Sequence, residues 1–370
     1  MTPRLKLKYL LIAICAFLIL KFFGVFTHIF ERDFYNDFHY PYDGDVHEFV
    51  EQLRHNVKPD VAPINVYNYS FITDCGHKCR SSEGDVLEPR LVYIVKSAIH
   101  NGARREAIRQ SWGYEHRFSD VTIRTVFLLG VDSDGTSFDT VKSEYNKYGD
   151  IVQANFIDSY YNNTIKTMMG FKWAVTHCSQ SKFYMFVDDD MYVSTKNVLR
   201  FVRNPTNYPA YLQEPVYSLK DKKKMADSRP RDKRQVLDFE LPNDVHLYSG
   251  YVFISAPHRH KTSKWHVDLD EYPYHMWPPY VTAGSYIVSR EALHELYYTS
   301  YYTKHFRFDD IYLGLVALKA NIEPYHCVEF HFYKKAYSVF GYTYVISSHG
   351  YEDPKELLRV WNEQKSAGNA

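Results

Sequence analysis

Residues 183–193 read FYMFVDDDMYV, an apolar stretch interrupted by three consecutive carboxylates, Asp188, Asp189 and Asp190. The apolar residues before the aspartates predict a buried strand, and a second short strand follows them. Carboxylates at a strand end are hard oxygen ligands, which suit Mn²⁺ or Mg²⁺ and leave coordination positions for the phosphate oxygens of a substrate. The stretch therefore predicts a metal site for a phosphorylated small molecule, with a solvated acidic turn as the alternative.

The composition bounds the class of protein. The chain has 370 residues, 45% of them hydrophobic, which is enough to bury the core of one or two domains. Because 44 basic residues balance 44 acidic residues, the overall charge offers no case for a nucleic-acid partner. The 34 Tyr and 24 Phe are numerous. We expect most of them to fill the core, and some of them to stack on sugar rings.

The N-terminal region predicts a membrane anchor. Residues 9–26 are almost continuously apolar, broken only by Lys21, and they follow a basic segment. Eighteen helical residues span roughly 27 Å, enough for a thin bilayer. The segment lacks the small residues of a cleavage site, which favours an anchor over a cleaved signal peptide. We therefore expect residues 1–8 to be a cytoplasmic tail and the chain to be a single-pass type II membrane protein.

Two sequence triplets agree with a luminal body. Asn68-Tyr69-Ser70 and Asn162-Asn163-Thr164 match the acceptor pattern for N-glycosylation. Such triplets also occur by chance, so Asn68 and Asn162 are candidate glycosylation sites only.

The cysteines also suit an oxidising compartment. Apart from Cys15 in the predicted span there are four cysteines, an even number that permits three disulfide pairings. We favour the pairs Cys75–Cys79 and Cys178–Cys327. A zinc half-site at the first pair is disfavoured, because no second pair of closely spaced cysteines would complete it.

The rest of the chain divides into a stem and a domain. Residues 27–88 are polar without sustained periodicity, which is typical of a luminal stem. Over residues 89–370 the pattern predicts strands at 91–95 and 125–130, and helices at 104–112 and 164–177. Strands that alternate with helices predict an α/β fold with a mostly parallel central sheet. Ligands of such sheets collect at the carboxyl ends of the strands, where the three aspartates lie.

Dense charge interrupts this domain at residues 215–247. We expect a flexible surface insertion there, because runs of mixed sign are usually solvated loops. A basic patch that docks on acidic lipid headgroups is the alternative.

Two later segments carry candidate substrate-binding chemistry. Residues 272–280 read YPYHMWPPY and predict either a wall that stacks on sugar rings or a proline-stiffened core. Asp309 and Asp310 lie at the start of a predicted helix that continues to Ala320. At that position they would stabilise the N-terminus of the helix. An ionised aspartate is also a general base at neutral pH if it reaches a substrate hydroxyl.

Six short motifs in order along the chain resemble the inverting β-1,3-glycosyltransferases of glycosyltransferase family 31: residues 104–113, 127–130, 149–151, 158–167, 188–190 and 278–280. The resemblance extends from about Leu91 to Trp361. It implies a catalytic domain of the GT-A type that binds a UDP-sugar and Mn²⁺, on the luminal side of the Golgi membrane. It does not indicate an oligomeric state.

The resemblance also implies roles for the acidic motif. Asp190 matches the metal-binding last aspartate, Asp188 lies nearer the nucleotide sugar, and Asp189 supports the site. His349 resembles the late histidine that completes the metal site, and His326 and His331 are rivals for that role.

Other site residues follow from the same resemblance. Asp310 matches the proposed catalytic base, whereas Asp309 stands where the family more often has Glu, so its separate role is open. Arg105, Arg109 and Lys166 would place positive charge near the nucleotide, or would equally be members of surface ion pairs.

Within the family, an invertebrate branch that builds glycosphingolipids is similar at residues 104–119, 186–199, 263–283 and 306–320. This implies transfer of GlcNAc from UDP-GlcNAc, in β-1,3 linkage, to a mannosyl-glucosylceramide glycolipid acceptor. A β-1,3-galactosyltransferase is an alternative, because contacts that the sequence does not expose decide which hydroxyl orientation is accepted. A non-catalytic, membrane-anchored sugar-binding protein is the alternative of a different class. A metal-dependent phosphohydrolase is a further alternative, but it would need more clustered ligands than the chain shows.

Overall fold

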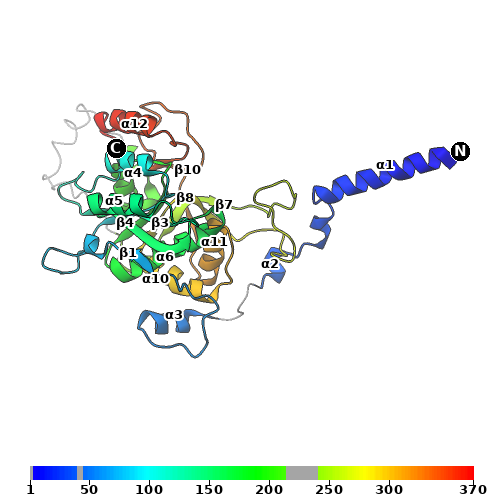
Figure 1. Ribbon diagram of the computed structural model, residues 1–370, viewed down its shortest axis with the longest axis horizontal. Coiled ribbons are helices and arrows are strands. Elements are labelled where there is room, and N and C mark those ends of the chain that lie inside the picture. Colours follow the sequence, from blue (N-terminus) through cyan, green and yellow to red (C-terminus); the bar gives the residue numbers. More distant parts are fainter. Residues whose placement is uncertain (1–2, 40–44, 214–240) are drawn as a thin grey trace, which may run out of the picture.

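The computed structural model describes residues 3–39, 45–213 and 241–370 (Figure 1). An eight-stranded sheet of order β1-β4-β3-β2-β5-β8-β7-β9 forms its centre. The strands are β1 (Phe71–Thr73), β2 (Leu91–Lys96), β3 (Ile123–Val131), β4 (Ile151–Ile157), β5 (Phe183–Asp188), β7 (Tyr248–Phe253), β8 (Tyr280–Ser289) and β9 (Tyr325–His326).

The described helices pack on both faces of this sheet, except for the N-terminal helix. They are α1 (Pro3–Phe22), α2 (Phe34–Asp37), α3 (His47–Arg54), α4 (Gly102–Arg109), α5 (Phe138–Tyr148), α6 (Asn163–His177), α7 (Thr195–Arg203), α8 (Ala210–Gln213), α10 (Arg290–Thr299), α11 (Asp309–Lys319) and α12 (Pro354–Ser366). Short 3₁₀ turns are η1 (Thr27–Phe30), η2 (Gly76–Cys79), η3 (Tyr160–Asn162), η4 (Pro205–Asn207) and η5 (Ser300–Tyr302). The α/β class and each strand and helix predicted in the domain are confirmed, with ends shifted by a few residues.

The sheet is mixed rather than mostly parallel. Strands β4, β3, β2 and β5 are parallel neighbours, whereas β8 pairs antiparallel with both β5 and β7. Parallel pairing needs a long crossover, which is usually a helix. The connection from β7 to β8, residues 254–279, contains no helix, so β8 returns antiparallel. The predicted parallel sheet therefore describes only the half that carries the acidic motif.

The side chains of the central strands alternate between two cores. In β2, Val92 and Ile94 belong to the cluster that packs against α6, α10 and α11. Leu91, Tyr93 and Val95 belong to the opposite cluster, which includes Trp112 and residues of α7 and α12. Both faces of β2 are thus buried, as expected for a strand in the parallel part of a sheet.

A second, small sheet of order β10-β11-β6 lies beside the first. Its strands are β6 (Tyr192–Val193), β10 (Phe330–His331) and β11 (Ser347–Ser348). Strand β11 pairs antiparallel with β6, with Ser348 opposite Tyr192. This pairing brings the C-terminal part of the chain next to the acidic motif.

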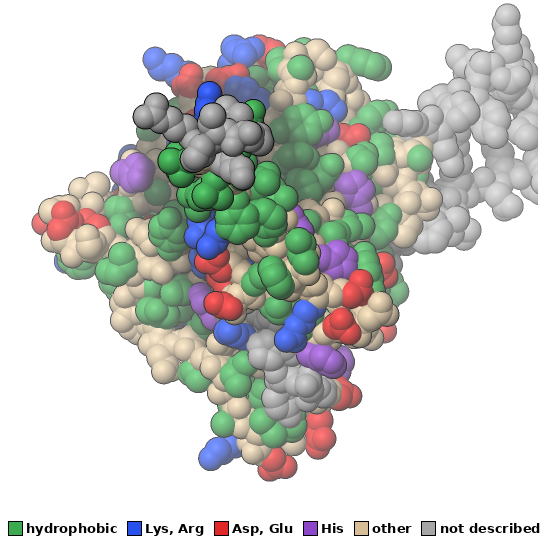
Figure 2. Space-filling view, turned by 90° about the vertical axis from the view of Figure 1, so that its right-hand side faces the viewer, with side chains coloured by type: hydrophobic (Ala, Val, Ile, Leu, Met, Phe, Trp, Pro, Cys, Tyr) green, Lys and Arg blue, Asp and Glu red, His purple; other side chains and the backbone are tan. Residues whose placement is uncertain are grey.

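Helix α1 projects away from the globular body (Figure 1). Viewed from that side, hydrophobic side chains gather over the upper middle of the face (Figure 2). The expected membrane span over residues 9–26 is not supported. Helix α1 ends at Phe22, and no helix within the described ranges is both long and apolar enough to cross a membrane.

Much of the predicted stem packs on the domain instead of standing apart from it. Val46, the N-cap of α3, and Val50 within α3 form a small core with Tyr302. Arg54 of the same helix pairs with Glu291 of α10 at 2.6 Å. Strand β1 joins the edge of the main sheet by pairing with β4. The sequence did not predict this packing, because the apolar residues of this segment show no sustained periodic pattern.

The charged insertion falls largely outside the described residues. Residues 214–240 carry most of its charge and are not described. Its last part returns to the body, where Leu241 and Val245 pack against the core and Leu247 is buried.

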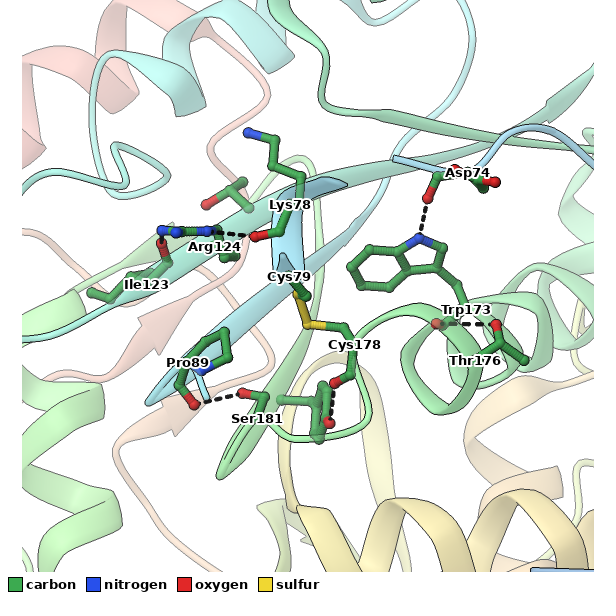
Figure 3. Close-up of a disulfide and its surroundings, with 12 residues drawn as sticks. Asp74, Lys78, Cys79, Pro89, Ile123, Arg124, Trp173, Thr176, Cys178 and Ser181 are labelled. Atoms are coloured by element: carbon green, nitrogen blue, oxygen red, sulfur yellow. Dashed lines mark hydrogen bonds between the residues drawn. A yellow bond between two sulfur atoms is a disulfide. The ribbon is translucent and has the colours of Figure 1, made fainter. Parts of the chain in front are cut away.

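The disulfide pairing differs from the predicted one. Cys79 bonds to Cys178 (Figure 3). Cys75 and Cys327 are free and buried. Cys178 cannot pair with Cys327, because the two lie in the cores on opposite faces of the sheet. The Cys75 thiol donates to the carbonyl of Ile151 at 3.0 Å.

The disulfide joins η2 to the end of α6, and the contacts around it tie the same segments together (Figure 3). The Trp173 indole donates to the Asp74 carbonyl, and the Arg124 Nε donates to the Lys78 carbonyl at 2.6 Å. The N-terminal segment is therefore held to the domain by both covalent and polar contacts.

We predict that Cys178→Ser lowers the free energy of unfolding by about 2–5 kcal/mol, because the bond closes a long loop of the unfolded chain. Thermal unfolding with and without reductant measures this. The exposed Cys15→Ser variant is the control and should match the unmodified protein. Equal stability of Cys178→Ser and the unmodified protein under oxidising conditions would contradict the pairing.

Candidate functional site

A buried lysine connects three elements at the carboxyl ends of the parallel strands. Strands β2 and β5 are in register, so their last residues, Lys96 and Asp188, lie side by side. The Lys96 Nζ lies 3.2 Å from Asp188 Oδ1 and 2.9 Å from Asp309 Oδ2 at the start of α11. It also donates to the Ala283 carbonyl of β8 at 3.1 Å. One ammonium group thus holds two carboxylates that are distant in the sequence.

The charges of this cluster shift one another's pKa values. Burial alone would lower the pKa of Lys96, but Asp188 and Asp309 raise it, so Lys96 stays protonated. Burial likewise favours the neutral form of Asp309, but the Lys96 charge and hydrogen bond and the Thr167 hydroxyl hold its pKa below the usual value. For Asp188, burial and its acidic neighbours outweigh Lys96 and raise the pKa to about 7. The cluster is therefore one coupled charge system.

Asp310 differs from Asp309 because its carboxylate has no side-chain hydrogen-bond partner among the described residues. Its Oδ1 accepts only from the backbone N–H of Ile311, at 2.8 Å, and no side chain within the described residues donates to it. Burial and the charge of Asp309 raise the pKa of Asp310 to about 7. Phe308 is the N-cap of α11, so neither aspartate occupies the capping position. A partly buried carboxylate with a raised pKa is suited to exchange a proton near neutral pH.

The small sheet brings His349 to Asp190. Because β11 pairs with β6, the backbone N–H of Tyr351 donates to the Asp190 carbonyl at 2.8 Å. The His349 Nε2 then lies 3.3 Å from Asp190 Oδ2. Burial would raise the pKa of Asp190, but the His349 hydrogen bond and charge lower it. The same bond raises the pKa of His349.

One oxygen of this pair lacks a partner. Asp190 Oδ1 is buried without a hydrogen bond, which is costly for a carboxylate and marks a position where a cation would be stabilised. Carboxylate oxygen and imidazole nitrogen together suit Mn²⁺. Within the described ranges no cluster of three or more His, Cys, Asp or Glu side chains forms a complete metal site. A metal held here would thus take its other ligands from substrate oxygens or water.

The rival histidines lie elsewhere. The His326 Nδ1 accepts from the backbone N–H of Val252 at 3.1 Å. The His331 Nε2 lies 3.2 Å from Lys335 Nζ and 3.7 Å from Glu329 Oε2. Of the three histidines, the structure places only His349 against Asp190.

Asp189 accepts hydrogen bonds from the loop that follows β2 and from the first turn of α4. Its carboxylate accepts from Ser97 Oγ at 2.6 Å, Asn101 Nδ2 at 2.9 Å and Arg104 Nη1 at 2.9 Å. The side chain is buried, so no oxygen of it is left for a ligand. This geometry agrees with a supporting role and not with direct contact to a cofactor.

The three predicted nucleotide-binding cations lie in internal ion pairs. Arg105 bonds to Glu144 at 2.7 Å and to three groups in the loop after β2. Arg109 bonds to Glu144 and Asp150, both at 2.8 Å. Lys166 bonds to Asp158 at 2.6 Å and to the Ser97 carbonyl at 2.8 Å. The structure thus favours the ion-pair alternative, although these pairs are buried or nearly so rather than on the surface.

Sequence reasoning missed Lys96, Thr167 and Arg104. The signal for Lys96 was present, because it ends the apolar stretch LVYIVK as Asp188 ends FYMFVD. A charged residue after a buried parallel strand lies at the edge where ligands collect. Thr167 and Arg104 carry no such signal, since their partners come from other elements.

The candidate glycosylation sites differ in access. Asn68 is exposed, whereas the Asn162 side chain is partly buried and donates to the Ile157 carbonyl at 2.8 Å.

We predict that Lys96→Met lowers the free energy of unfolding by about 3 kcal/mol, because Asp309 would remain buried without its cation. Urea unfolding at pH 7 measures this. Adding Asp309→Asn to the variant should recover part of the loss, since the unpaired charge is then removed. A Lys96→Met variant as stable as the unmodified protein would contradict the pairing.

Comparison with known proteins agrees with this geometry. The Galactosyltransferase family model matches residues 103–252 and 235–328. The chain is 42% identical over 369 residues to Beta-1,3-galactosyltransferase brn of Drosophila melanogaster, the Brainiac protein, covering 99% of this chain and 98% of that protein. It is 31% identical over 304 residues to Beta-1,3-galactosyltransferase 1 of Homo sapiens, covering 82% and 81%. The expected similarity to the invertebrate branch is thus confirmed.

Solved structures are more distant. The galactosyltransferase LgtC, in complex with donor and acceptor sugar analogs, is 10% identical with a TM-score of 0.36, covering 75% of this chain and 100% of that chain. Mouse xyloside xylosyltransferase 1 is 11% identical with a TM-score of 0.27, covering 71% and 98%. TM-scores this low establish no shared fold. The family assignment rests on the sequence matches, which show that the chain belongs to the Galactosyltransferase family, glycosyltransferase family 31, and is a β-1,3-hexosyltransferase.

Proposed function

We propose that this β-1,3-hexosyltransferase transfers GlcNAc from UDP-GlcNAc, with inversion, to a mannosyl-glucosylceramide acceptor, in a GT-A type site. The observation that carries the proposal is the uncommitted Asp310 carboxylate, adjacent in sequence to Asp309, which is fixed by Lys96. Inverting transfer needs one base that accepts the proton of the acceptor hydroxyl. It also needs a separate site that stabilises the negative charge of the departing diphosphate. The Asp310 and Asp190 positions supply these two requirements from different elements.

In this mechanism, Asp310 accepts the proton of the acceptor 3-hydroxyl as that oxygen attacks the anomeric carbon of the donor. Its raised pKa makes it a stronger base than an ordinary aspartate near neutral pH. Lys96 holds Asp309, the sequence neighbour of Asp310, and Asp188 in fixed positions. Asp190 and His349 would hold Mn²⁺, which as a Lewis acid stabilises negative charge on the departing UDP by several kcal/mol when it is bound.

Galactose transfer is the second candidate. Both relatives named above carry the name Beta-1,3-galactosyltransferase. The two donor sugars differ in the orientation of the 4-hydroxyl and in the 2-acetamido group that only GlcNAc carries. A direct comparison of the two donors distinguishes the candidates.

We further propose that the catalytic unit works in the Golgi lumen, next to a membrane that carries its glycolipid acceptor. The disulfide between Cys79 and Cys178 supports this location, because such bonds persist in oxidising compartments. Glycosidase digestion of the cell-made protein tests it, through glycans on Asn68 and Asn162. A fully reduced protein without glycans would contradict a luminal location.

A radiolabel transfer assay tests the proposed reaction. The full chain in detergent receives UDP-GlcNAc or UDP-Gal with Mn²⁺, and mannosyl-glucosylceramide or lactosylceramide as acceptor. GlcNAc transfer to the mannosyl acceptor is the expected result. Transfer of Gal alone would support the second candidate, and hydrolysis without transfer to any acceptor would contradict both.

We predict that Asp310→Asn reduces turnover by about 10²- to 10⁴-fold, because the amide cannot accept the proton. UDP binding and thermal stability should change little, and the exposed Asp268→Asn variant should keep full activity. In the unmodified protein, activity should fall as the pH drops through about 7, where Asp310 becomes protonated. An unchanged turnover in Asp310→Asn would reject this base.

We predict that Asp190→Ala abolishes Mn²⁺-dependent binding of UDP, because it removes the unpaired carboxylate oxygen. Calorimetry with and without a chelator measures this. His349→Ala should weaken the same binding, whereas His326→Ala should leave it unchanged, since His326 bonds elsewhere. Metal-dependent binding of normal strength in Asp190→Ala would reject the metal site.

A further inference from the structure

A row of aromatic side chains begins beside Asp310 and has no part in the mechanism above. Asp310 and Gly314 are four residues apart on α11 and so share one face of the helix. A Cβ at Gly314 would lie 2.6 Å from the Tyr280 Cβ, so this face contacts the first residue of β8. Burial, with the charge of Asp310 adding to it, raises the pKa of Tyr280 to about 12. Tyr280 therefore lies next to the proposed base.

From Tyr280 the rings continue outward without a break. The Tyr280 ring stacks on Phe253 with centroids 5.8 Å apart and an interplanar angle of 28°. Phe253 contacts Phe332 at 4.8 Å, and Phe332 contacts Tyr251 at 4.6 Å. The row thus joins β7, β8 and the residue after β10.

The outer end of the row is open to solvent. Phe332 is 40% exposed, and its neighbours Tyr333 and Ile254 are 52% and 69% exposed. Core filling does not explain exposed rings, and a contiguous apolar surface beside a catalytic site is typical of a binding surface.

The Tyr280 end of the row is separated from Asp188 along strand β8. Gly284 of β8 lies near Asp188, since a Cβ there would be 4.0 Å from Asp188 Oδ2. Tyr280 lies four residues earlier, roughly 13 Å away at about 3.3 Å per residue. An acceptor whose hydroxyl reaches Asp310 therefore has the aromatic row available to the rest of its glycan.

We propose that Tyr251, Phe253 and Phe332 bind the acceptor sugar that follows the one receiving the new residue. This rests on the proposed function and assigns an acceptor class, a glycan of at least two hexoses. Flat ring faces match the apolar faces of hexoses, and polar groups at their edges suit sugar hydroxyls. His326 lies against Tyr251 at 4.9 Å, and Ser255 Oγ lies 3.0 Å from the Tyr280 hydroxyl. These polar edges favour a sugar over a lipid chain.

The test compares Phe332→Ala with Phe138→Ala, a similarly exposed phenylalanine on α5. The probes are methyl mannosyl-β-1,4-glucoside and methyl mannoside, in the full chain with UDP-GlcNAc and Mn²⁺. We expect Phe332→Ala to raise KM for the disaccharide about 5- to 50-fold. KM for the monosaccharide and for the donor should not change, and Phe332→Tyr should retain disaccharide affinity.

An unchanged disaccharide KM in both Phe332→Ala and Tyr251→Ala would overturn the proposal. Loss of activity only with glycolipid in vesicles, and not with the soluble disaccharide, would also overturn it and would indicate a lipid contact. If the unmodified protein transfers no sugar, the proposed function fails on its own. Saturation-transfer NMR of disaccharide binding then decides the aromatic site, because it needs no turnover: loss of the signal in Phe332→Ala supports the site, and an equal signal rejects it.

Discussion

The site depends on the ion pairs that Lys96 makes with Asp188 and Asp309. A buried ammonium group is stable only with opposite charge beside it, and two aspartates at one strand edge repel each other without it. Lys96 meets both conditions because β2 lies between β3 and β5, in register with β5. The start of α11, and with it Asp310, is thereby fixed to the centre of the sheet.

Around this centre the functional groups have different degrees of freedom. Asp189 accepts hydrogen bonds from three side chains, and Asp309 Oδ2 is held by Lys96 and Thr167. His349 contacts Asp190 Oδ2, and Asp190 Oδ1 has no hydrogen-bond partner. Asp310 accepts a hydrogen bond from the backbone N–H of Ile311, and no side chain of the described residues donates to it. A buried carboxylate oxygen without a partner is costly to fold, so the unpaired Asp190 Oδ1 is better explained by a bound cation than by stability.

The N-terminal segment shows how local sequence can mislead. Residues 45–79 show no sustained periodicity. They nevertheless form the edge strand β1, the helix α3 that packs against α10, and one cysteine of the disulfide, Cys79. Each of these contacts is made with a residue far away in the sequence. The buried apolar side chains are distributed over several short elements, so no single element shows a clear pattern. The same reason explains the wrong cysteine pairing, since which sheet face a cysteine occupies depends on the whole topology.

The sequence by itself determined the α/β class, the strands of the domain, the acidic motif at a strand end and the family, because strong periodicity and motif order are local properties. It also singled out Asp190, His349 and Asp310 through the family resemblance. Only the tertiary structure decided that His349, and not His331, contacts Asp190. It also decided that Lys96 forms ion pairs in the site, and that Arg105 and Arg109 form ion pairs with Glu144. Ion pairs and short antiparallel strand pairings form between residues that are distant in the sequence. The spacing of residues along the chain does not indicate which distant residue will be the partner.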